Sequence, residues 1–204
     1  MRHRRALAVT PPVLFLLVSL LHPLPDWAHI VDSLAPRWTL WMAVHVAQLV
    51  LVPLLVFSVW MLLGGLTGRL PGLARAALIV FAAFYSAFDT IVGLGTGLLV
   101  RRAMLLDGAE REAAARLAQW FWDARLDPRL PVVWVIAIGT MAWLIAMIAT
   151  ALALRRAGAP RRIAVLLIVS GLALAIDHPF PTGTIAMFCL MIAISLRERT
   201  RYAS

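Results

Sequence analysis

The stretch ARAALIVFAAFYSAFDTIVGLGTGLLV, residues 74–100, decides the fold of this chain. A bilayer core about 30 Å thick requires roughly 20 predominantly apolar residues in a helix. This stretch exceeds that length, and Arg75 and Asp89 are its only charged residues. It therefore predicts a membrane-spanning helix. Three further stretches reach a similar length with as few charges: 6–24, 38–63 and 130–154.

The last apolar block, 163–196, is too long for a single span, because a helix of that length would run roughly 50 Å. The segment Asp177-His-Pro-Phe-Pro-Thr-Gly183 interrupts it and breaks helices. We therefore divide the block into spans 163–177 and 181–196, joined as a short hairpin. The sequence predicts an all-α integral membrane protein with six transmembrane helices, forming a single polytopic membrane domain over residues 1–204.

Composition supports the membrane class and excludes several others. Of the 204 residues, 62% are hydrophobic and only 14% are charged, which excludes both an ordinary soluble domain and a disordered chain. The formal charge of +9 comes from arginine alone, because the chain has no lysine; Schiff-base and Walker-type lysine chemistry are therefore excluded. Cys189 is the only cysteine, so neither an internal disulfide nor a cage of thiolate ligands can form.

The distribution of charge predicts the orientation. With a cytoplasmic amino terminus, the inner segments carry twelve arginines and one carboxylate, and the outer loops carry seven arginines and eight carboxylates. This is the positive-inside pattern. We expect a multi-pass protein of the cell inner membrane with both termini in the cytoplasm. Its basic ends would face anionic lipid headgroups, and no nucleic-acid partner is needed to explain the charge.

The one sizeable polar insertion, 103–128, would lie on the extracytoplasmic side. It predicts an amphipathic helix over about 107–125, with Asp107 and Glu110 as a capping box, lying along the outer membrane interface. Such a helix is either a connecting element or a lid over a cavity. Its predicted apolar face comprises Leu106, Ala109, Ala113, Leu117, Trp120, Phe121 and Ala124. The tryptophans expected to form an interfacial belt are Trp27, Trp38, Trp41, Trp120, Trp122 and Trp134.

A few polar side chains fall inside the predicted spans, where a functional role is the default hypothesis. His45 and Gln48 share one helical face, and Asp89 shares another with Gly93 and Gly97, along which a neighbouring helix can approach closely. Measured from the outer ends of their spans, His45 and Asp89 would lie at depths of about 10 and 16 Å, so tilt or a water molecule would be needed to join them. These groups are either interhelical hydrogen-bonding residues or a titrating site.

From these residues we predict a polar pocket that opens outward, with His22 and His29 at its rim. Its walls would be formed by His45, Gln48, Tyr85, Asp89, Asp177 and His178.

The outer loops also contain a candidate set of metal ligands. Imidazole and carboxylate groups there could hold Zn or Cu, although their spacing matches no recognised metal motif. A haem held between His45 and His178 is another alternative. The sequence requires none of these cofactors. The metal-ligand candidates are His22, Asp26, His29 and His178.

Three functions remain open. The first is binding or transport of a small solute or proton, with Asp89 titrating and His45 or His178 as its partner. The second is an accessory or assembly subunit that packs against other membrane proteins or against copies of itself. The third is a metal- or haem-dependent membrane enzyme, so the sequence leaves open whether the protein is an enzyme at all.

Overall fold

The computed structural model describes residues 2–176 and 181–201, and within these ranges the chain is helical without any strand. The predicted all-α class is therefore confirmed. The helices are α1 (Arg2–Leu21), α2 (Ile30–Leu34), α3 (Trp38–Leu62), α4 (Arg69–Phe88), α5 (Gly95–Met104), α6 (Gly108–Asp123), α7 (Pro131–Arg156), α8 (Arg161–Ile176) and α9 (Thr182–Arg201). The shorter elements are the 3₁₀ turn η1 (Ala35–Arg37), the π-helical turn η2 (Asp89–Leu94) and the 3₁₀ turn η3 (Ala124–Leu126).

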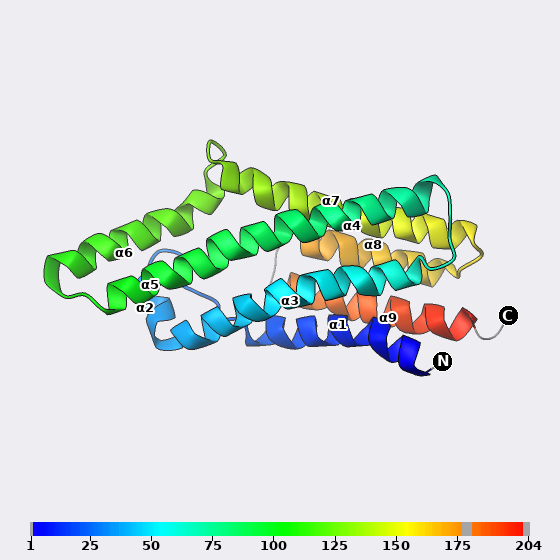
Figure 1. Ribbon diagram of the computed structural model, residues 1–204, viewed down its shortest axis with the longest axis horizontal. Coiled ribbons are helices and arrows are strands. Elements are labelled where there is room, and N and C mark those ends of the chain that lie inside the picture. Colours follow the sequence, from blue (N-terminus) through cyan, green and yellow to red (C-terminus); the bar gives the residue numbers. More distant parts are fainter. Residues whose placement is uncertain (1, 177–180, 202–204) are drawn as a thin grey trace.

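Six long helices form a closed ring in the order α1, α3, α4, α7, α8 and α9, with α9 returning to α1 (Figure 1). The start of α1, the α3–α4 loop and the α7–α8 turn lie together at one end, which we call the basic end because Arg4, Arg69 and Arg155 are there (Figure 1). The hairpin of α5 and α6 projects from the opposite end, which we call the hairpin end.

Among the residues that the structure describes, four helical segments are long and apolar enough to cross a membrane, as the sequence predicts: His3–Leu21, Ile30–Leu62, Arg69–Met104 and Pro131–Arg156. The six predicted spans are thus confirmed only in part. The predicted spans 163–177 and 181–196 correspond to α8 and α9, but α8 has only 16 residues and four charged residues end α9.

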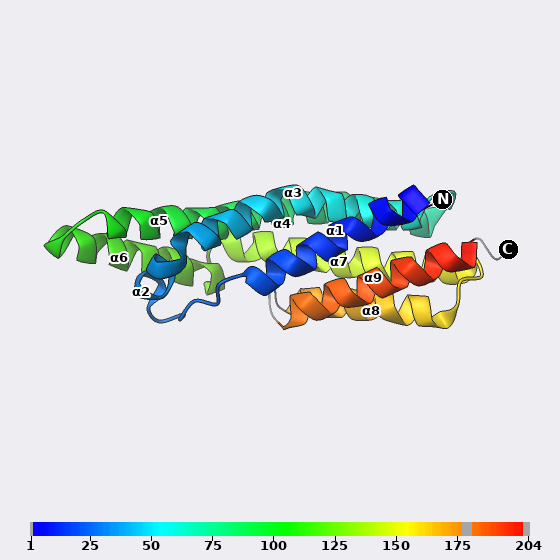
Figure 2. The ribbon, with the colours of Figure 1, turned by 90° about the horizontal axis from the view of Figure 1, so that it is seen from below.

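The segment Arg69–Met104 is much longer than a membrane requires. Its 36 residues extend for roughly 54 Å, against about 30 Å for the hydrocarbon core. The excess length is α5, which projects beyond the six-helix ring and packs against α6. Both views show α6 running back beside α5 along the long axis of the molecule (Figures 1 and 2).

This arrangement corrects two expectations about the insertion. The predicted helix exists as α6, but it is antiparallel to α5 and does not lie across the end of the bundle. Its buried face contains Ala118 and Trp122, whereas Leu117 and Trp120 of the predicted apolar face are exposed. The small side chain of Ala118 allows close approach to a neighbouring helix, and simple periodicity does not distinguish that face from its neighbour. Asp107 precedes the helix as expected but makes no side-chain capping bond.

Small residues also position α4 against α7 in the ring. A Cβ atom on Gly139 would lie 3.1 Å from the backbone nitrogen of Tyr85, so glycine lets α4 and α7 cross closely without displacing either backbone. Tyr85, Phe81 and Trp143 are fully buried at the crossing, where their rings pack at tilted angles. This packed layer lies on the basic-end side of the polar residues described next.

Candidate functional site

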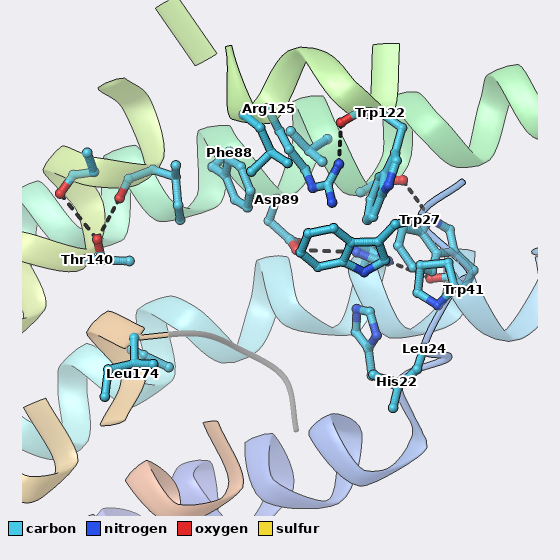
Figure 3. A pocket seen from close by; sticks show the side chains of 18 of the residues that line it. His22, Leu24, Trp27, Trp41, Phe88, Asp89, Trp122, Arg125, Thr140 and Leu174 are labelled. Atoms are coloured by element: carbon cyan, nitrogen blue, oxygen red, sulfur yellow. Dashed lines mark hydrogen bonds and ion pairs between the residues drawn. The ribbon is translucent and has the colours of Figure 1, made fainter. Parts of the chain in front are cut away.

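A cavity of about 650 Å³ lies where the six-helix ring gives way to the α5–α6 hairpin (Figure 3). Segments far apart in the sequence line it: the chain after α1, then α3, the α4–η2 junction, the α6–η3 junction, α7 and the end of α8. Its size is typical of small-molecule sites. The polar and aromatic lining residues are His22, Trp27, Trp41, His45, Phe88, Asp89, Trp122, Arg125 and Thr140.

His45 and Asp89 form the floor of the cavity. The Nε2 atom of His45 lies 3.8 Å from Oδ1 of Asp89, and both residues are nearly inaccessible, with 4% and 2% of their surfaces exposed. This separation is too long for a direct hydrogen bond. The other carboxylate oxygen, Oδ2, is buried and has no hydrogen-bond partner in residues 2–176 and 181–201.

The backbone contact of His45 determines which of its ring nitrogens carries hydrogen. Nδ1 lies 2.8 Å from the carbonyl oxygen of Trp41, and a carbonyl can only accept, so Nδ1–H is the donor. In the neutral ring Nε2 therefore presents a lone pair toward Asp89. Two acceptors thus face each other across 3.8 Å, an unfavourable arrangement that is relieved by protonation of one group or by a donor that contacts both.

His22 repeats this arrangement at the side of the cavity. Its Nδ1 lies 2.8 Å from the carbonyl oxygen of Pro23, and its ring centroid lies 5.0 Å from that of His45. His22 comes one residue after the span His3–Leu21, and burial lowers the pKa of its imidazole to about 4. It is therefore neutral at pH 7, with Nε2 as an acceptor.

The π-helical turn η2 begins at Asp89 and interrupts an otherwise continuous helix. Such turns leave backbone carbonyls without regular partners and are frequent at functional sites. Two tryptophans of α3 satisfy carbonyls in and just beyond this turn: Trp41 Nε1 donates to the Gly93 carbonyl at 2.7 Å, and Trp38 Nε1 donates to the Gly97 carbonyl at 2.6 Å. These bonds fix α3 in register with the Asp89 segment.

Gly93 allows His45 to lie against the turn. A Cβ atom at this position would lie 2.6 Å from Cγ of His45 and would also collide with the ring carbon Cδ2. A Cβ atom on Gly97 would likewise collide with Met42 and meet Trp41 Cδ1 at 3.0 Å. The prediction that a helix approaches along the glycine face of Asp89 is confirmed, and the approaching helix is α3.

Aromatic rings connect the floor to the mouth of the cavity. The Trp41 ring contacts His45 at 4.2 Å between centroids and Trp122 at 5.9 Å. At the mouth, the guanidinium carbon of Arg125 lies 3.6 Å from the Trp122 ring centroid and 4.5 Å from that of Trp27. Arg125 Nη1 also donates to the Trp122 carbonyl at 2.6 Å, which holds the cation over these rings (Figure 3).

The structure brings together only some of the predicted pocket residues. His22, His45 and Asp89 line the cavity. Gln48 is fully buried one helical turn from His45, and its amide has no hydrogen-bond partner in the described ranges, while Tyr85 belongs to the packed core. Asp177 and His178 lie outside the described residues.

The predicted metal ligands do not converge in the part of the chain that the structure describes. His29 is exposed and pairs with Asp26 at 3.0 Å, whereas His22 lines the cavity without them. No group of three histidine, cysteine or carboxylate side chains there could hold a metal ion. The fourth candidate ligand, His178, lies beyond these ranges.

Sequence reasoning underestimated how closely His45 and Asp89 approach each other. The expected depths were measured from Trp38 and Arg101, as if these two residues lay at the same height along their helices. In the structure Trp38 lies beside Gly97, whose carbonyl accepts its indole hydrogen bond. The long side chain of Arg101 only reaches back over the Trp38 ring. His45 and Asp89 are therefore level in the antiparallel pair of helices and face each other directly.

Sequence reasoning did not assign six of the polar and aromatic lining residues to the cavity: Trp27, Trp41, Phe88, Trp122, Arg125 and Thr140. Trp41 and Trp122 were expected in an interfacial belt, but they are 2% and 7% exposed and line the cavity. Arg125 was counted as a loop charge, yet it is 9% exposed over the tryptophan rings. The close spacing of Trp38, Trp41 and His45 on one helical face was the available signal.

Searches against protein-family models, curated proteins and solved structures find no match to this chain. Its class therefore rests on its own features. The described residues form an all-helical protein with four helices long and apolar enough to span a membrane, and they enclose a cavity with a buried histidine–carboxylate pair.

Proposed function

We propose that the protein binds a small solute in the His45–Asp89 cavity, which is reached from the extracytoplasmic side of the inner membrane. The observation that carries this proposal is the pair of facing acceptors, 3.8 Å apart and buried within a cavity of about 650 Å³. Because two unpaired acceptors are unfavourable in a buried site, a bound donor stabilises them. In the absence of solute, protonation of one of the two groups removes the repulsion between facing lone pairs.

The proposed orientation follows from charge. The basic end carries twelve arginines and a single carboxylate, which fits a cytoplasmic face with both termini there. In this orientation α8 and α9 are the fifth and sixth spans, and the α5–α6 hairpin projects outside. The arginines at the basic end are Arg2, Arg4, Arg5, Arg69, Arg75, Arg155, Arg156, Arg161, Arg162, Arg197, Arg199 and Arg201.

Packing favours access from the hairpin end. Toward the basic end, α3 and α4 fill the ring with apolar side chains such as Val52, Leu55 and Leu78, none of which is exposed. In the described ranges, the buried charged side chains are Asp89 and Arg125 at the cavity and Glu198 at the basic end, where it pairs with Arg4. Binding from one side therefore accounts for this conformation, and transport would require a second conformation with an opening through this layer.

Single-cysteine labelling tests the proposed access. Cys189 is the only cysteine, so a Cys189→Ser background is unreactive. In that background Thr140→Cys places a thiol in the cavity lining, and Ser58→Cys places one at a fully buried position of α3 away from the cavity. We expect a membrane-impermeant thiol reagent added outside to modify the first variant and not the second. Modification of Thr140→Cys only from the cytoplasmic side would overturn the proposal.

A further inference from the structure

We infer that the ligand of this cavity is a small amphipathic amine, bound as an ammonium ion by Asp89 and His45 with its apolar part against α7 and α8. This inference rests on the proposed binding function and specifies the chemical class of the solute. It depends on three features of the cavity: a floor of acceptors, a buried carboxylate and an apolar wall.

The floor requires a ligand that donates hydrogen bonds. His45 Nε2 and both oxygens of Asp89 are acceptors when the imidazole is neutral and the carboxylate is ionised. Near the floor, Trp41 Nε1 bonds the Gly93 carbonyl and Thr140 Oγ1 bonds the Ile136 carbonyl, whereas Trp122 Nε1 has no hydrogen-bond partner in the described ranges. An ammonium group offers several N–H donors from a single atom, and one placed between His45 and Asp89 would satisfy both facing acceptors.

Charge favours an amine over a neutral alcohol. Asp89 Oδ2 is buried without a hydrogen-bond partner in the described ranges, and hydrogen bonds between charged groups are about twice as strong as neutral ones. The titratable or charged side chains of the described lining are His22 after α1, His45 on α3, Asp89 and Arg125 of η3; the described lining residues of α7 and α8 carry no charge. Arg125 lies over the tryptophan rings at the mouth.

The wall opposite the pair requires an apolar part of the ligand. Ile136 and Ala137 of α7 and Leu174 and Ile176 of α8 form this wall. Ile176 is 75% exposed, so the wall continues to the surface of the bundle. A short hydrocarbon chain of the ligand that packs against this wall is removed from water, which is favourable. The amine of the same ligand remains at the floor of the cavity.

Three probes with the same hydrocarbon chain separate charge from hydrophobicity: hexylamine, hexan-1-ol and hexanoate. Binding to the native chain in nanodiscs is measured by calorimetry and by protection of the Thr140→Cys variant from labelling. We expect hexylamine to bind at least tenfold more tightly than hexan-1-ol, and hexanoate not to bind. Asp89→Asn should reduce hexylamine affinity at least tenfold, whereas Glu112→Gln, on the exposed face of α6, should leave it unchanged.

The outcomes distinguish this inference from the proposed function. If Thr140→Cys is labelled from outside and hexylamine neither binds nor protects, the amine assignment is wrong and the open cavity stands. Equal binding of hexan-1-ol, preferential binding of hexanoate at Arg125, or stoichiometric Zn²⁺ that excludes hexylamine would also overturn it. The probe series on the native chain gives this result even if Asp89→Asn fails to fold.

Discussion

Replacement of Gly93 by alanine tests the central contact of the structure. The added Cβ atom would lie 2.6 Å from Cγ and 2.5 Å from Nε2 of His45, and real Cβ atoms essentially never approach within 3.0 Å of another heavy atom. His45 is in turn held by its Nδ1–H bond to the Trp41 carbonyl, so its ring cannot retreat without breaking that bond. We therefore expect Gly93→Ala to displace the imidazole from Asp89.

The magnitude follows from overpacking. Extra methyl groups in a packed interior destabilise by typically about 1–3 kcal/mol. For a chain of this size, 1 kcal/mol corresponds to a change in Tm of about 2–4 °C, so we expect Gly93→Ala to lower Tm by about 2–12 °C. The matched control is Gly72→Ala on the same helix, where a Cβ atom meets nothing within 4 Å. Helix propensity predicts that this control gains up to about 1 kcal/mol.

A double-mutant cycle assigns the effect to the imidazole. If the methyl group acts by colliding with the ring, His45→Ala should remove most of the destabilisation that Gly93→Ala causes in the native background. Thermal unfolding of the four chains in the same detergent gives the coupling energy. Additive effects, or a Gly93→Ala variant as stable as Gly72→Ala, would show that Gly93 does not position His45.

Two more predictions concern the tryptophan bond and pH. Trp41→Phe should destabilise the protein by about 1–3 kcal/mol in thermal unfolding, because it leaves the buried Gly93 carbonyl unpaired; Trp134→Phe, which removes an exposed indole bond, should have little effect. Burial lowers the pKa of His22 from 6.5 to about 4. Between these two pH values the unfolded chain therefore binds more protons than the folded chain. As the pH falls through this window, the free energy of unfolding should decrease by up to about 3 kcal/mol. His22→Gln should flatten the dependence of Tm on pH in this window, and an unchanged slope would contradict the burial of His22.

The spans could be predicted from sequence because hydropathy is a local property. Expected bounds of 38–63 and 130–154 differ from Trp38–Leu62 and Pro131–Arg156 by at most two residues. The same locality explains the weak points. Because α8 is short and α9 ends in charged residues, their membrane-spanning role stays a prediction. A hydropathy window also cannot show that α5 projects beyond the ring, because it reports only local apolar content.

The chain by itself determined that His45 and Asp89 would be expensive to bury, and that Gly93 and Gly97 would admit a neighbouring helix. These conclusions need only residue chemistry and helical periodicity. The tertiary structure decided that α3 is that neighbour, that a π-helical turn begins at Asp89, and that His22 joins the pair from after α1.

The tertiary structure alone also placed Trp41, Trp122 and Arg125 at the cavity. An amphipathic aromatic or cationic side chain has the same local signature at a membrane surface and at the mouth of a cavity, since both environments combine apolar and polar contacts. The difference lies in contacts with segments distant in the sequence, as when Arg125 meets Trp27. Such contacts exist only once the helices are packed.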